Sequence, residues 1–474
     1  MRNLLIADRR PRGSGGGVIR VIEPAKGEPF EEVAAAGPAD LDAAVAAAKA
    51  AQPGWGGRTA FARAEILFTF ADLVRAHVEE LATLEARNVG KPIGDARWEA
   101  NHVADTLRYY AGAADKHLGE TIPVKKGGLD ITLRVPLGVV GLIVPWNFPM
   151  VIATWKVAPA LACGNTVVLK PASLTPLTAL RLGELALEAG VPPGVLNVVP
   201  GPGAAIGAAL SAHPDVAKIG FTGETATGRA IMAAAAQTIK RVSLELGGKS
   251  PCIVFGDVDI AQAAGEAAAS VFANAGQDCC ARSRTIVERS VYPEFVTAMQ
   301  AAAERTVVGD PLDEKTQMGP VISTHQRDVT ERYVALGKEE GARLVCGGSR
   351  VAGPGFFLRP AVFADAKPGM CIVDEEIFGP VASVIAFDTE DEAIAIANDS
   401  IYGLSGSLWT NDLKRGLRVA RAVETGVMSV NSSSSVHLQA PFGGFKQSGL
   451  GRELGLHALD HYSEIKNIYF ETAP

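Results

Sequence analysis

The chain has 474 residues, of which 47% are hydrophobic and 20% charged, an ordinary globular composition that allows about two or three domains with large cores. The formal net charge of −7 at pH 7 leaves no basic footprint, so nucleic acid is not expected as a partner. The apolar stretches are short and broken by glycine, proline or charge, and the basic N-terminus lacks the apolar core of a signal peptide, so we expect neither a membrane span nor a leader.

The N-terminal part of the chain predicts a hairpin followed by helices. Two β-type runs, Leu4–Ile6 and Val18–Ile22, flank a glycine-rich stretch and predict a hairpin with a loose loop. Asp40 is a typical helix cap, and it precedes an alanine-rich segment with an apolar face. The following segments predict two helical stretches and one strand, at 59–88, 94–114 and 131–135.

From residue 139 onward, short apolar strands alternate with helices. The expected strands lie at 139–144, 166–169, 196–199, 218–221 and 284–288, and the expected helices at 178–189, 204–212, 292–307 and 327–340. This alternation predicts an α/β fold with two doubly wound lobes, a Rossmann-like cofactor domain and a catalytic domain. A late strand at 462–470 has no strand neighbour in sequence, so it is expected to pair with a distant segment or with another subunit.

A thiol is the main chemical candidate. Six scattered cysteines form neither a disulfide framework nor a metal-ligand spacing, so we expect no metal site. Because free thiols are typical of a reducing compartment, we expect the protein in the cytoplasm. Isolated cysteines are usually small buried hydrophobes, which is our interpretation of Cys163, Cys252, Cys346 and Cys371. The segment Gly-Gln-Asp-Cys selects Cys279 over its neighbour Cys280 as the nucleophile.

A carboxylate upstream is the candidate base. A thiol that attacks a carbonyl leaves a thioester or similar adduct, and a base must then activate water to remove it. Glu245, in Leu-Glu-Leu-Gly-Gly-Lys, follows a predicted strand and offers that base, although a lone glutamate is most often a solvated surface charge. Asn147, between two prolines, either belongs to a simple turn or directs its amide at a developing oxyanion.

Two further segments suggest a dinucleotide site. Lys170 ends a predicted strand, at the sheet edge where open α/β sheets bind ligands, although such a lysine is usually just solvated. The segment 221–228 predicts strand, glycine turn and helix, and the N-terminus of that helix suits a pyrophosphate. The glycines of 201–207 have the wrong spacing for a dinucleotide fingerprint and predict a turn and a helix start instead.

Together these motifs resemble the aldehyde dehydrogenase superfamily, in its NAD(P)-dependent, non-acylating form. Leu244–Pro251 and Gly276–Cys279 are similar to its two signature motifs in order and separation. The resemblance spans nearly the whole chain, with further matches at 145–149, 170–171, 375–380, 398, 402–404, 441–444 and 448–453.

The resemblance implies a mechanism. The Cys279 thiolate attacks the aldehyde, the Asn147 amide and the Cys279 N–H hold the oxyanion, and Glu245 activates water against the thioester. Lys156 and Glu453 occupy positions linked to proton relay. The cofactor, NAD or NADP, would contact the residues Val144, Pro145, Trp146, Lys170, Ser173, Gly203, Phe221, Thr222, Gly223, Glu224, Gly228, Leu246, Gly247, Glu376 and Phe378.

Three residues depart from the family pattern. Ser173 stands where many NAD-preferring relatives carry a glutamate, so a 2′-phosphate is not repelled and we expect NADP to be accepted. Glu224 stands where serine is commoner and adds negative charge near the expected pyrophosphate. Asp278 could raise the pKa of the adjacent thiol unless its carboxylate points away.

The expected substrate tunnel is aromatic and mostly apolar. Similarity to the family implies that it is lined by Phe148, Ile152, Trp155 and Phe442 and narrowed by Ser434 and Val436. Such a wall suits a medium-sized apolar or aromatic aldehyde, or an amino aldehyde held by cation–π attraction. Glu99 and His102 either reach the tunnel mouth, as in aminoaldehyde-oxidising relatives, or form a solvated helix face.

Three alternatives are open at this point. A CoA-acylating aldehyde dehydrogenase generally lacks the base, so Glu245 argues against it. A catalytically idle protein on the same scaffold would not need thiol, base, amide and cofactor contacts together. A cysteine hydrolase would need a histidine partner for the thiol, and none of the eight histidines lies in a recognisable motif.

The resemblance also implies an organisation. We expect residues 1–118 and 137–247 to form the NAD(P)-binding domain and 248–438 the catalytic domain. Segments 119–136 and 439–474 would bridge subunits in a dimer or tetramer, with a small-molecule aldehyde as the other partner and no nucleic acid or membrane.

Overall fold

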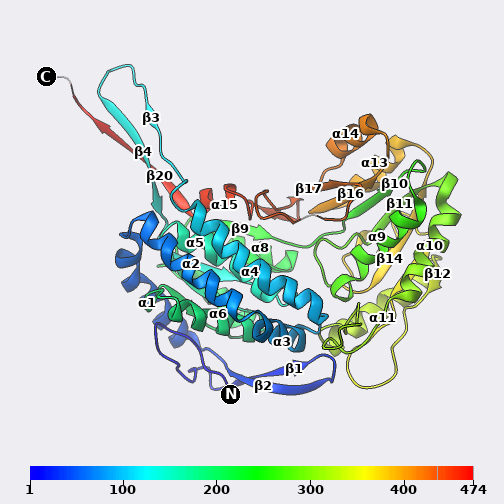
Figure 1. Ribbon diagram of the computed structural model, residues 1–474, viewed down its shortest axis with the longest axis horizontal. Coiled ribbons are helices and arrows are strands. Elements are labelled where there is room, and N and C mark those ends of the chain that lie inside the picture. Colours follow the sequence, from blue (N-terminus) through cyan, green and yellow to red (C-terminus); the bar gives the residue numbers. More distant parts are fainter. Residues whose placement is uncertain (435, 473–474) are drawn as a thin grey trace.

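Two large sheets, each in its own lobe, and a projecting arm make up the computed structural model (Figure 1). It describes residues 1–434 and 436–472. Residue 435, in the predicted catalytic domain, and residues 473–474, in the predicted bridging tail, lie outside the described part. The architecture is α/β with mostly parallel sheets, which confirms the expected fold class.

The first lobe contains a six-stranded sheet in the order β19-β9-β8-β5-β6-β7. Its strands are β5 (Val139–Ile143), β6 (Thr166–Lys170), β7 (Leu196–Val198), β8 (Lys218–Thr222), β9 (Arg241–Glu245) and the antiparallel edge strand β19 (Gly449–Leu450). The five longer strands are parallel, and their order reverses direction between β5 and β8. Such a reversal is the switch point at which open α/β sheets bind ligands.

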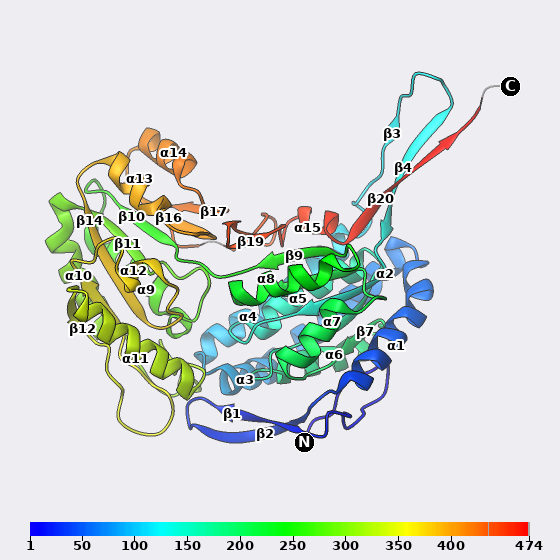
Figure 2. The ribbon, with the colours of Figure 1, turned by 180° about the vertical axis from the view of Figure 1, so that it is seen from behind.

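Helices cover both faces of this sheet. The helices of the lobe are α1 (Pro38–Gly56), α2 (Ala60–Ala76), α3 (Val78–Val89), α4 (Ile93–Ala113), α5 (Pro149–Ala162), α6 (Leu177–Glu188), α7 (Ala208–Ala212) and α8 (Thr225–Ala236). α5 and α6 lie on one face with α2–α4 outside them, and α1, α7 and α8 lie on the other (Figure 2). Accordingly Val140 and Leu142 of β5 enter one core, whereas Val139 and Ile143 enter a second core on the opposite face.

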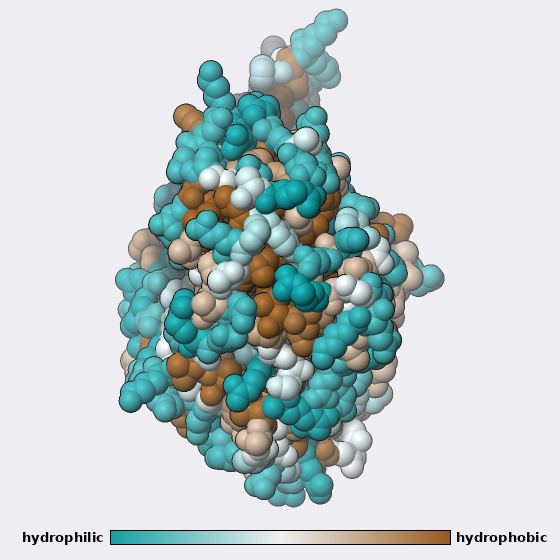
Figure 3. Space-filling view, turned by 90° about the vertical axis from the view of Figure 1, so that its right-hand side faces the viewer, coloured by the Kyte–Doolittle hydropathy of each residue, from teal (hydrophilic) through white to brown (hydrophobic). Residues whose placement is uncertain are grey.

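The second lobe contains a seven-stranded sheet in the order β12-β13-β14-β11-β10-β16-β17. Its strands are β10 (Pro251–Val254), β11 (Arg284–Glu288), β12 (Arg343–Cys346), β13 (Ala361–Ala364), β14 (Val381–Phe387), β16 (Ser405–Trp409) and β17 (Val427–Val430). Its helices are α9 (Ile260–Phe272), α10 (Tyr292–Arg305), α11 (Thr324–Glu339), α12 (Cys371–Asp374), α13 (Glu390–Asn398) and α14 (Leu413–Ala422). Its outer side carries apolar patches interspersed with hydrophilic side chains (Figure 3).

The arm is a three-stranded antiparallel sheet that extends away from the lobes (Figure 1). Strand β4 (Leu129–Pro136) lies between β3 (Thr121–Ile122) and the late strand β20 (Ser463–Phe470), which follows the short helix α15 (His457–Asp460). The predicted tail strand is therefore present and pairs with a distant segment of its own chain. Leu133, Ile465 and Phe470 are exposed on this arm.

Three local predictions for the N-terminal part need correction. The strand at 18–22 belongs to β1 (Val18–Glu23), which pairs with β2 (Glu28–Ala34), whereas Leu5 bridges to Val198 of β7. The single helical stretch 59–88 is two helices that meet at His77. Asp40 lies inside the first turn of α1, where its carboxylate accepts the Gly37 N–H at 2.8 Å.

Two small observations complete the fold. β15 (Tyr402–Gly403) pairs with β18 (Phe445–Lys446), which ties the C-terminal loops to the second lobe. Within the described residues, no helix combines the length and hydropathy required of a membrane span. The division into cofactor-binding, catalytic and bridging segments stays a prediction.

Candidate active site

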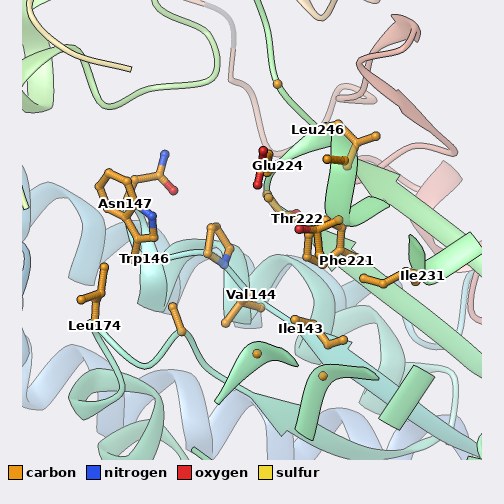
Figure 4. Close-up of a pocket in the computed structure, with 18 of the residues that line it drawn as sticks. Ile143, Val144, Trp146, Asn147, Leu174, Phe221, Thr222, Glu224, Ile231 and Leu246 are labelled. Carbon is orange, nitrogen blue, oxygen red and sulfur yellow. The ribbon is translucent and has the colours of Figure 1, made fainter. Parts of the chain in front are cut away.

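A cavity of about 1050 Å³ runs between the lobes at the switch point of the six-stranded sheet. Trp146 and Asn147, which follow β5, lie on one side of it. Thr222 at the end of β8, Glu224 just after it and Leu246 just after β9 lie on the other (Figure 4). Cys279 also lines this cavity. A thiol and the expected dinucleotide side of the molecule therefore share one space.

The second lobe reaches this cavity with loops that precede its strands. Cys279 lies before β11, and Glu376 and Phe378 lie before β14. The backbone before the thiol is unusual, because Asn274, Ala275 and Gly276 all have positive φ, at 49°, 55° and 73°. Asn274 uses its side-chain amide to bond the carbonyl oxygens of Asn147 and Gln277, at 3.1 and 3.2 Å, which offsets the cost of that conformation.

The thiol of Cys279 is half-buried in the cavity wall. The Cys280 thiol, hydrogen-bonded to it, raises the pKa of Cys279 well above its usual value, and burial and the nearby Asp278 act in the same direction. Asp278 does not point fully away: its carboxylate accepts the Cys280 N–H at 2.8 Å, and burial raises its own pKa. The thiol therefore holds its proton at neutral pH and needs a base during turnover.

Asp278, Cys279 and Cys280 also form a compact group. Their carboxylate and sulfur atoms all lie within 4.8 Å of one another, a spacing that could hold a metal ion. The expectation that the protein has no metal site therefore stays a prediction.

Asn147 is fixed from two directions at the start of α5. Its side-chain Nδ2 donates to the Gln277 carbonyl at 3.0 Å, which leaves its second amide hydrogen for a ligand. Its own carbonyl oxygen accepts bonds from Asn274 and from Lys91, the latter at 2.9 Å. The amide thus lies beside the loop that carries Cys279.

Glu245 is the last residue of β9 and is buried. Burial raises its pKa well above the usual value, the nearby Glu453 adds to the rise, and Lys156 opposes it. One carboxylate oxygen, Oε2, has no hydrogen-bond partner among the described residues, so the group is free to take a water. Cys280 is close enough for its charge to act on Glu245.

The glycine after the base allows the two lobes to approach closely. A Cβ placed on Gly248 would lie 2.2 Å from the carbonyl oxygen of Cys279. Any other residue at this position would push the nucleophile loop away from the strand end that carries Glu245.

Lys156 and Glu453 form a buried ion pair. Lys156 comes from α5, and Glu453 bridges to Phe442 by two backbone hydrogen bonds of 2.7 Å. The pair therefore lies next to both Glu245 and the expected substrate wall.

The cofactor side fits a dinucleotide. The N-terminus of α8 opens into the cavity, and the hydroxyl of Thr222 just before it is buried without a partner among the described residues. Lys170 lines the cavity, and burial lowers its pKa to about 8. Ser173 donates to the Gly201 carbonyl at 3.0 Å, and Glu224 is an exposed carboxylate at the first turn of α8.

The nicotinamide end of this side is shaped by the second lobe. Glu376 accepts the Gly248 N–H at 2.9 Å, and burial raises its pKa to about 7. Phe378, held at φ 58°, meets the Trp146 ring edge-on at 5.2 Å between centroids. The shape, the unpartnered donors and the helix N-terminus are what a long, anionic, hydroxyl-rich ligand requires.

Most of the predicted cofactor residues line this one cavity. They are Val144, Pro145, Trp146, Lys170, Ser173, Gly203, Phe221, Thr222, Gly223, Glu224, Leu246, Gly247, Glu376 and Phe378. Gly228 does not line it: a Cβ there would meet the Leu246 side chain at 2.7 Å, so this glycine brings α8 close to a lining residue.

The predicted substrate residues fall into two groups. Phe148 and Ile152 line the cavity with Cys279. Trp155 and Phe442 are buried behind them, ring to ring at 5.3 Å, and Val436 packs on the same core while Ser434 is exposed.

The positions of Glu99 and His102 differ most from the sequence-based predictions. Both are buried, so the alternative prediction of a solvated helix face is wrong. Glu99 pairs with Lys91, and His102 accepts the Trp155 indole N–H at 3.0 Å while Trp98 stacks on it at 4.9 Å. Neither lines the cavity, and burial lowers the pKa of His102 to about 4, which keeps it neutral.

Sequence reasoning missed several lining residues. The largest set comes from α11 and α8: His325, Gln326, Val329, Ala226, Thr227, Ala230, Ile231 and Ala234. The amphipathic pattern of α8 could have indicated its lining residues, because a helix whose N-terminus faces a ligand also has one side toward that ligand. The sequence predicted a helix at 327–340 but not that it lines the cavity, because α11 reaches the cavity through the packing of the two lobes.

The fold and site define an α/β protein with a thiol in a long cavity at a topological switch point. Residues 12–468 match the aldehyde dehydrogenase family. Retinal dehydrogenase 2 of Mus musculus is 45% identical over 470 residues, which cover 98% of this chain and 91% of that protein.

Two further comparisons agree. The mitochondrial aldehyde dehydrogenase family 2 member B4 of Arabidopsis thaliana is 46% identical over 469 residues, covering 98% of this chain and 87% of that protein. An aldehyde dehydrogenase from Bacillus cereus, solved as its NAD+ complex, superposes with a TM-score of 0.98 at 42% identity, covering 100% of this chain and 97% of that one. The chain belongs to the aldehyde dehydrogenase family and is an NAD(P)-dependent aldehyde dehydrogenase, which confirms the predicted class.

Proposed function

We propose that the protein oxidises an aldehyde to the carboxylic acid with NAD(P)+ through a covalent adduct on Cys279. The observation that carries this proposal is that the Cys279 thiol lines the same cavity as the helix N-terminus and hydroxyls suited to a dinucleotide. The buried, unpartnered Glu245 carboxyl at the end of β9 supports it, because the adduct must be hydrolysed.

In the first half-reaction the Cys279 sulfur bonds to the aldehyde carbon, and the thiol proton passes to water in the cavity. The oxygen of the adduct gains negative charge, which the free N–H of the Asn147 amide and the Cys279 N–H stabilise. Trp146, Glu376 and Phe378 would hold a nicotinamide, which would supply the acceptor for the hydride that leaves the substrate carbon. The carbonyl re-forms, and Cys279 holds a thioester.

In the second half-reaction Glu245 takes a proton from water, whose oxygen attacks the thioester. The carbon–sulfur bond breaks, the acid departs, and the sulfur takes a proton from water, which regenerates the thiol. Glu245 must pass its own proton on, and the adjoining buried Lys156–Glu453 pair offers a route for it. Because Glu245 is retained, a CoA-acylating activity is disfavoured.

For the cofactor, we propose NAD+, with NADP+ also accepted. The Bacillus cereus relative binds NAD+. Ser173 offers a hydroxyl rather than a carboxylate at the expected ribose, and Lys170 supplies a cation to the same part of the cavity. The cofactor residues predicted from the sequence are proposed in those roles.

The substrate class proposed is a medium-sized apolar, aromatic or amino aldehyde. Phe148 and Ile152 beside Cys279, backed by Trp155 and Phe442, make that end of the site apolar and aromatic. A relative named retinal dehydrogenase 2 agrees with an apolar substrate. Steady-state rates with aliphatic, aromatic and amino aldehydes distinguish the three classes.

The protein is proposed to form a dimer or tetramer through its arm, where Leu133, Ile465 and Phe470 are exposed. Light scattering measures the oligomeric state.

The proposed compartment is the cytoplasm. A named mitochondrial relative makes localisation of a tagged full chain the deciding observation. We retain the predicted domains, 1–118 with 137–247, 248–438, and the two bridging segments 119–136 and 439–474, as proposals.

The function is tested by cofactor reduction on addition of an aldehyde. Cys279→Ala is expected to abolish turnover, by at least about 10⁴-fold, because the covalent step is lost. Cys346→Ala, a half-buried thiol of the second lobe, is the matched control and should turn over normally. Turnover by Cys279→Ala, or its loss in Cys280→Ala with Cys279 intact, would contradict the assignment.

A further inference from the structure

Beneath Asn147 lies a cluster of three buried charged residues that the proposed mechanism does not use. Glu85 comes from α3, Glu99 from α4, and Lys91 from the turn between these helices. Their exposures are 0%, 1% and 1%. Burying three ionisable groups is costly, so their contacts deserve an account.

Lys91 is engaged in three directions. Its ammonium group pairs with Glu99 and lies 4.0 Å from a carboxylate oxygen of Glu85. It donates to the Asn147 carbonyl oxygen at 2.9 Å. It also lies over the Phe148 ring, 4.3 Å from the centroid. Both of the residues it touches in the loop before α5 line the cavity beside Cys279.

The two carboxyl groups balance the single cation. The carboxyl groups of Glu85 and Glu99 lie around the one ammonium group of Lys91, and burial raises the pKa of both. Because two neighbouring buried carboxylates repel each other, the cluster favours the state in which one of them is protonated. Thr178 on α6 anchors Glu85 by a bond of 2.9 Å.

The Asn147 carbonyl connects this cluster to the nucleophile loop. Lys91 bonds that oxygen from below, and Asn274 bonds it from the loop of Cys279 while also bonding Gln277. The Asn147 amide in turn donates to Gln277. If the Asn147 carbonyl moved, the peptide plane would rotate. The side-chain amide of Asn147 would then leave the place where negative charge develops on the substrate oxygen.

We propose that Lys91, neutralised by Glu99 and Glu85, is a positioning residue that fixes the Asn147–Phe148 peptide and so directs the Asn147 amide at the oxyanion. The inference rests on the proposed function. It gives Glu99 a structural partner inside the protein instead of a contact with an amino substrate.

The test replaces Lys91 by methionine in the full chain. Rapid mixing with aldehyde should show cofactor reduction slowed by about 10- to 100-fold, a share of the effect of losing an oxyanion donor. The dissociation constant of the cofactor and the aldehyde KM should change less than about threefold. Alkylation of Cys279 by iodoacetamide, which forms no oxyanion, should keep its wild-type rate, and a merely structural defect would lower it as well.

Two further variants guard against misfolding. Lys91→Met combined with Glu99→Gln leaves no unpaired charge and should show the same slow reduction. Glu99→Gln alone leaves the bond from Lys91 to Asn147 in place and should reduce cofactor within about threefold of wild type, with amino and neutral aldehydes alike. Arg97→Gln is the control on α4, since the ion pairs of Arg97 among the described residues, with Glu79 and Glu314, lie at the surface.

The outcomes separate the inference from the function. Wild-type rates in the folded double variant, or equal losses of alkylation and cofactor reduction, would overturn the role of Lys91. A selective loss for amino aldehydes in Glu99→Gln would overturn it in favour of a substrate contact. Failure of wild type to reduce cofactor with any aldehyde would instead overturn the proposed function.

Discussion

The two large sheets meet the cavity with opposite ends. In the six-stranded sheet the site residues follow the strands: Asn147 after β5, Glu224 after β8, and Glu245 at the end of β9. In the seven-stranded sheet they precede the strands, with Cys279 before β11 and Glu376 before β14.

The difference separates the cofactor side of the cavity from the nucleophile. Carboxyl ends of parallel strands lead into helix N-termini, whose free N–H groups and positive dipole ends suit an anionic cofactor. Amino ends offer loops without that dipole. There the nucleophile depends on individual neighbours, and those neighbours raise its pKa. The first sheet provides the ligand site together with the hydrolytic base Glu245, and the second provides the nucleophile Cys279.

The largest effect on turnover is expected from Glu245→Gln, which tests the contrast between the two sheets. Glu245 is the reactive group of the first sheet, and its amide cannot take a proton from water, so steady-state turnover should fall by roughly 10²- to 10⁴-fold. The first half-reaction uses Cys279 and should still give one burst of cofactor reduction per site. Stopped-flow absorbance measures the burst, and mass spectrometry should find the trapped thioester. If the burst is lost as well, Glu245 also deprotonates the thiol and the division of labour between the sheets fails.

A smaller effect is expected at Lys170. Burial lowers its pKa to about 8, so the ammonium is charged below that pH and neutral above it. The ratio of kcat/KM for NADP+ over NAD+ should therefore decline as pH rises through about 8. Lys170→Gln should lower the ratio at pH 7 about tenfold, the loss of one charge-assisted contact, and remove its pH dependence.

The control for this prediction is Lys49→Gln, an exposed lysine of the same lobe that pairs with Asp215. It should leave the ratio unchanged. A wild-type preference for NAD+ above about a thousandfold, roughly 4 kcal/mol, would show that Ser173 and Lys170 do not admit the 2′-phosphate.

The smallest effect is expected at Glu224, whose carboxylate lies at the N-terminus of α8, the helix that follows β8 of the first sheet. Glu224→Ser should tighten cofactor binding by about 3- to 10-fold. Added salt should reduce the difference in dissociation constant between the variant and wild type, because the carboxylate is exposed. Fluorescence titration measures the dissociation constant. Asp259→Ser removes an acid from the N-terminus of α9, away from the cavity, and should change nothing. Weaker binding by Glu224→Ser would mean that this carboxylate contacts the cofactor directly.

The sequence predicted what depends on local patterns. Strand–helix alternation located the strands of the first lobe, and the ordered motifs around Glu245 and Cys279 brought out residues that now lie near one cavity. It failed where packing decides. Nothing local distinguishes the partner of the strand at 18–22, or shows that a helix ends at His77 and begins again one residue later. For Glu99 the sequence left a tunnel mouth and a solvated helix face open, and it missed the buried pair because the partner Lys91 gave no signal of its own.

The edge strand β19 bears on when the protein becomes competent. Gly449 pairs with Glu245, and Glu453 acts on its pKa, so part of the surroundings of this acid comes from segments that follow Cys279 in the chain. A nascent polypeptide that has emerged only as far as Cys279 and β11 carries the sulfur nucleophile before these segments exist. The hydrolytic half of the site is therefore completed after the half that carries the thiol.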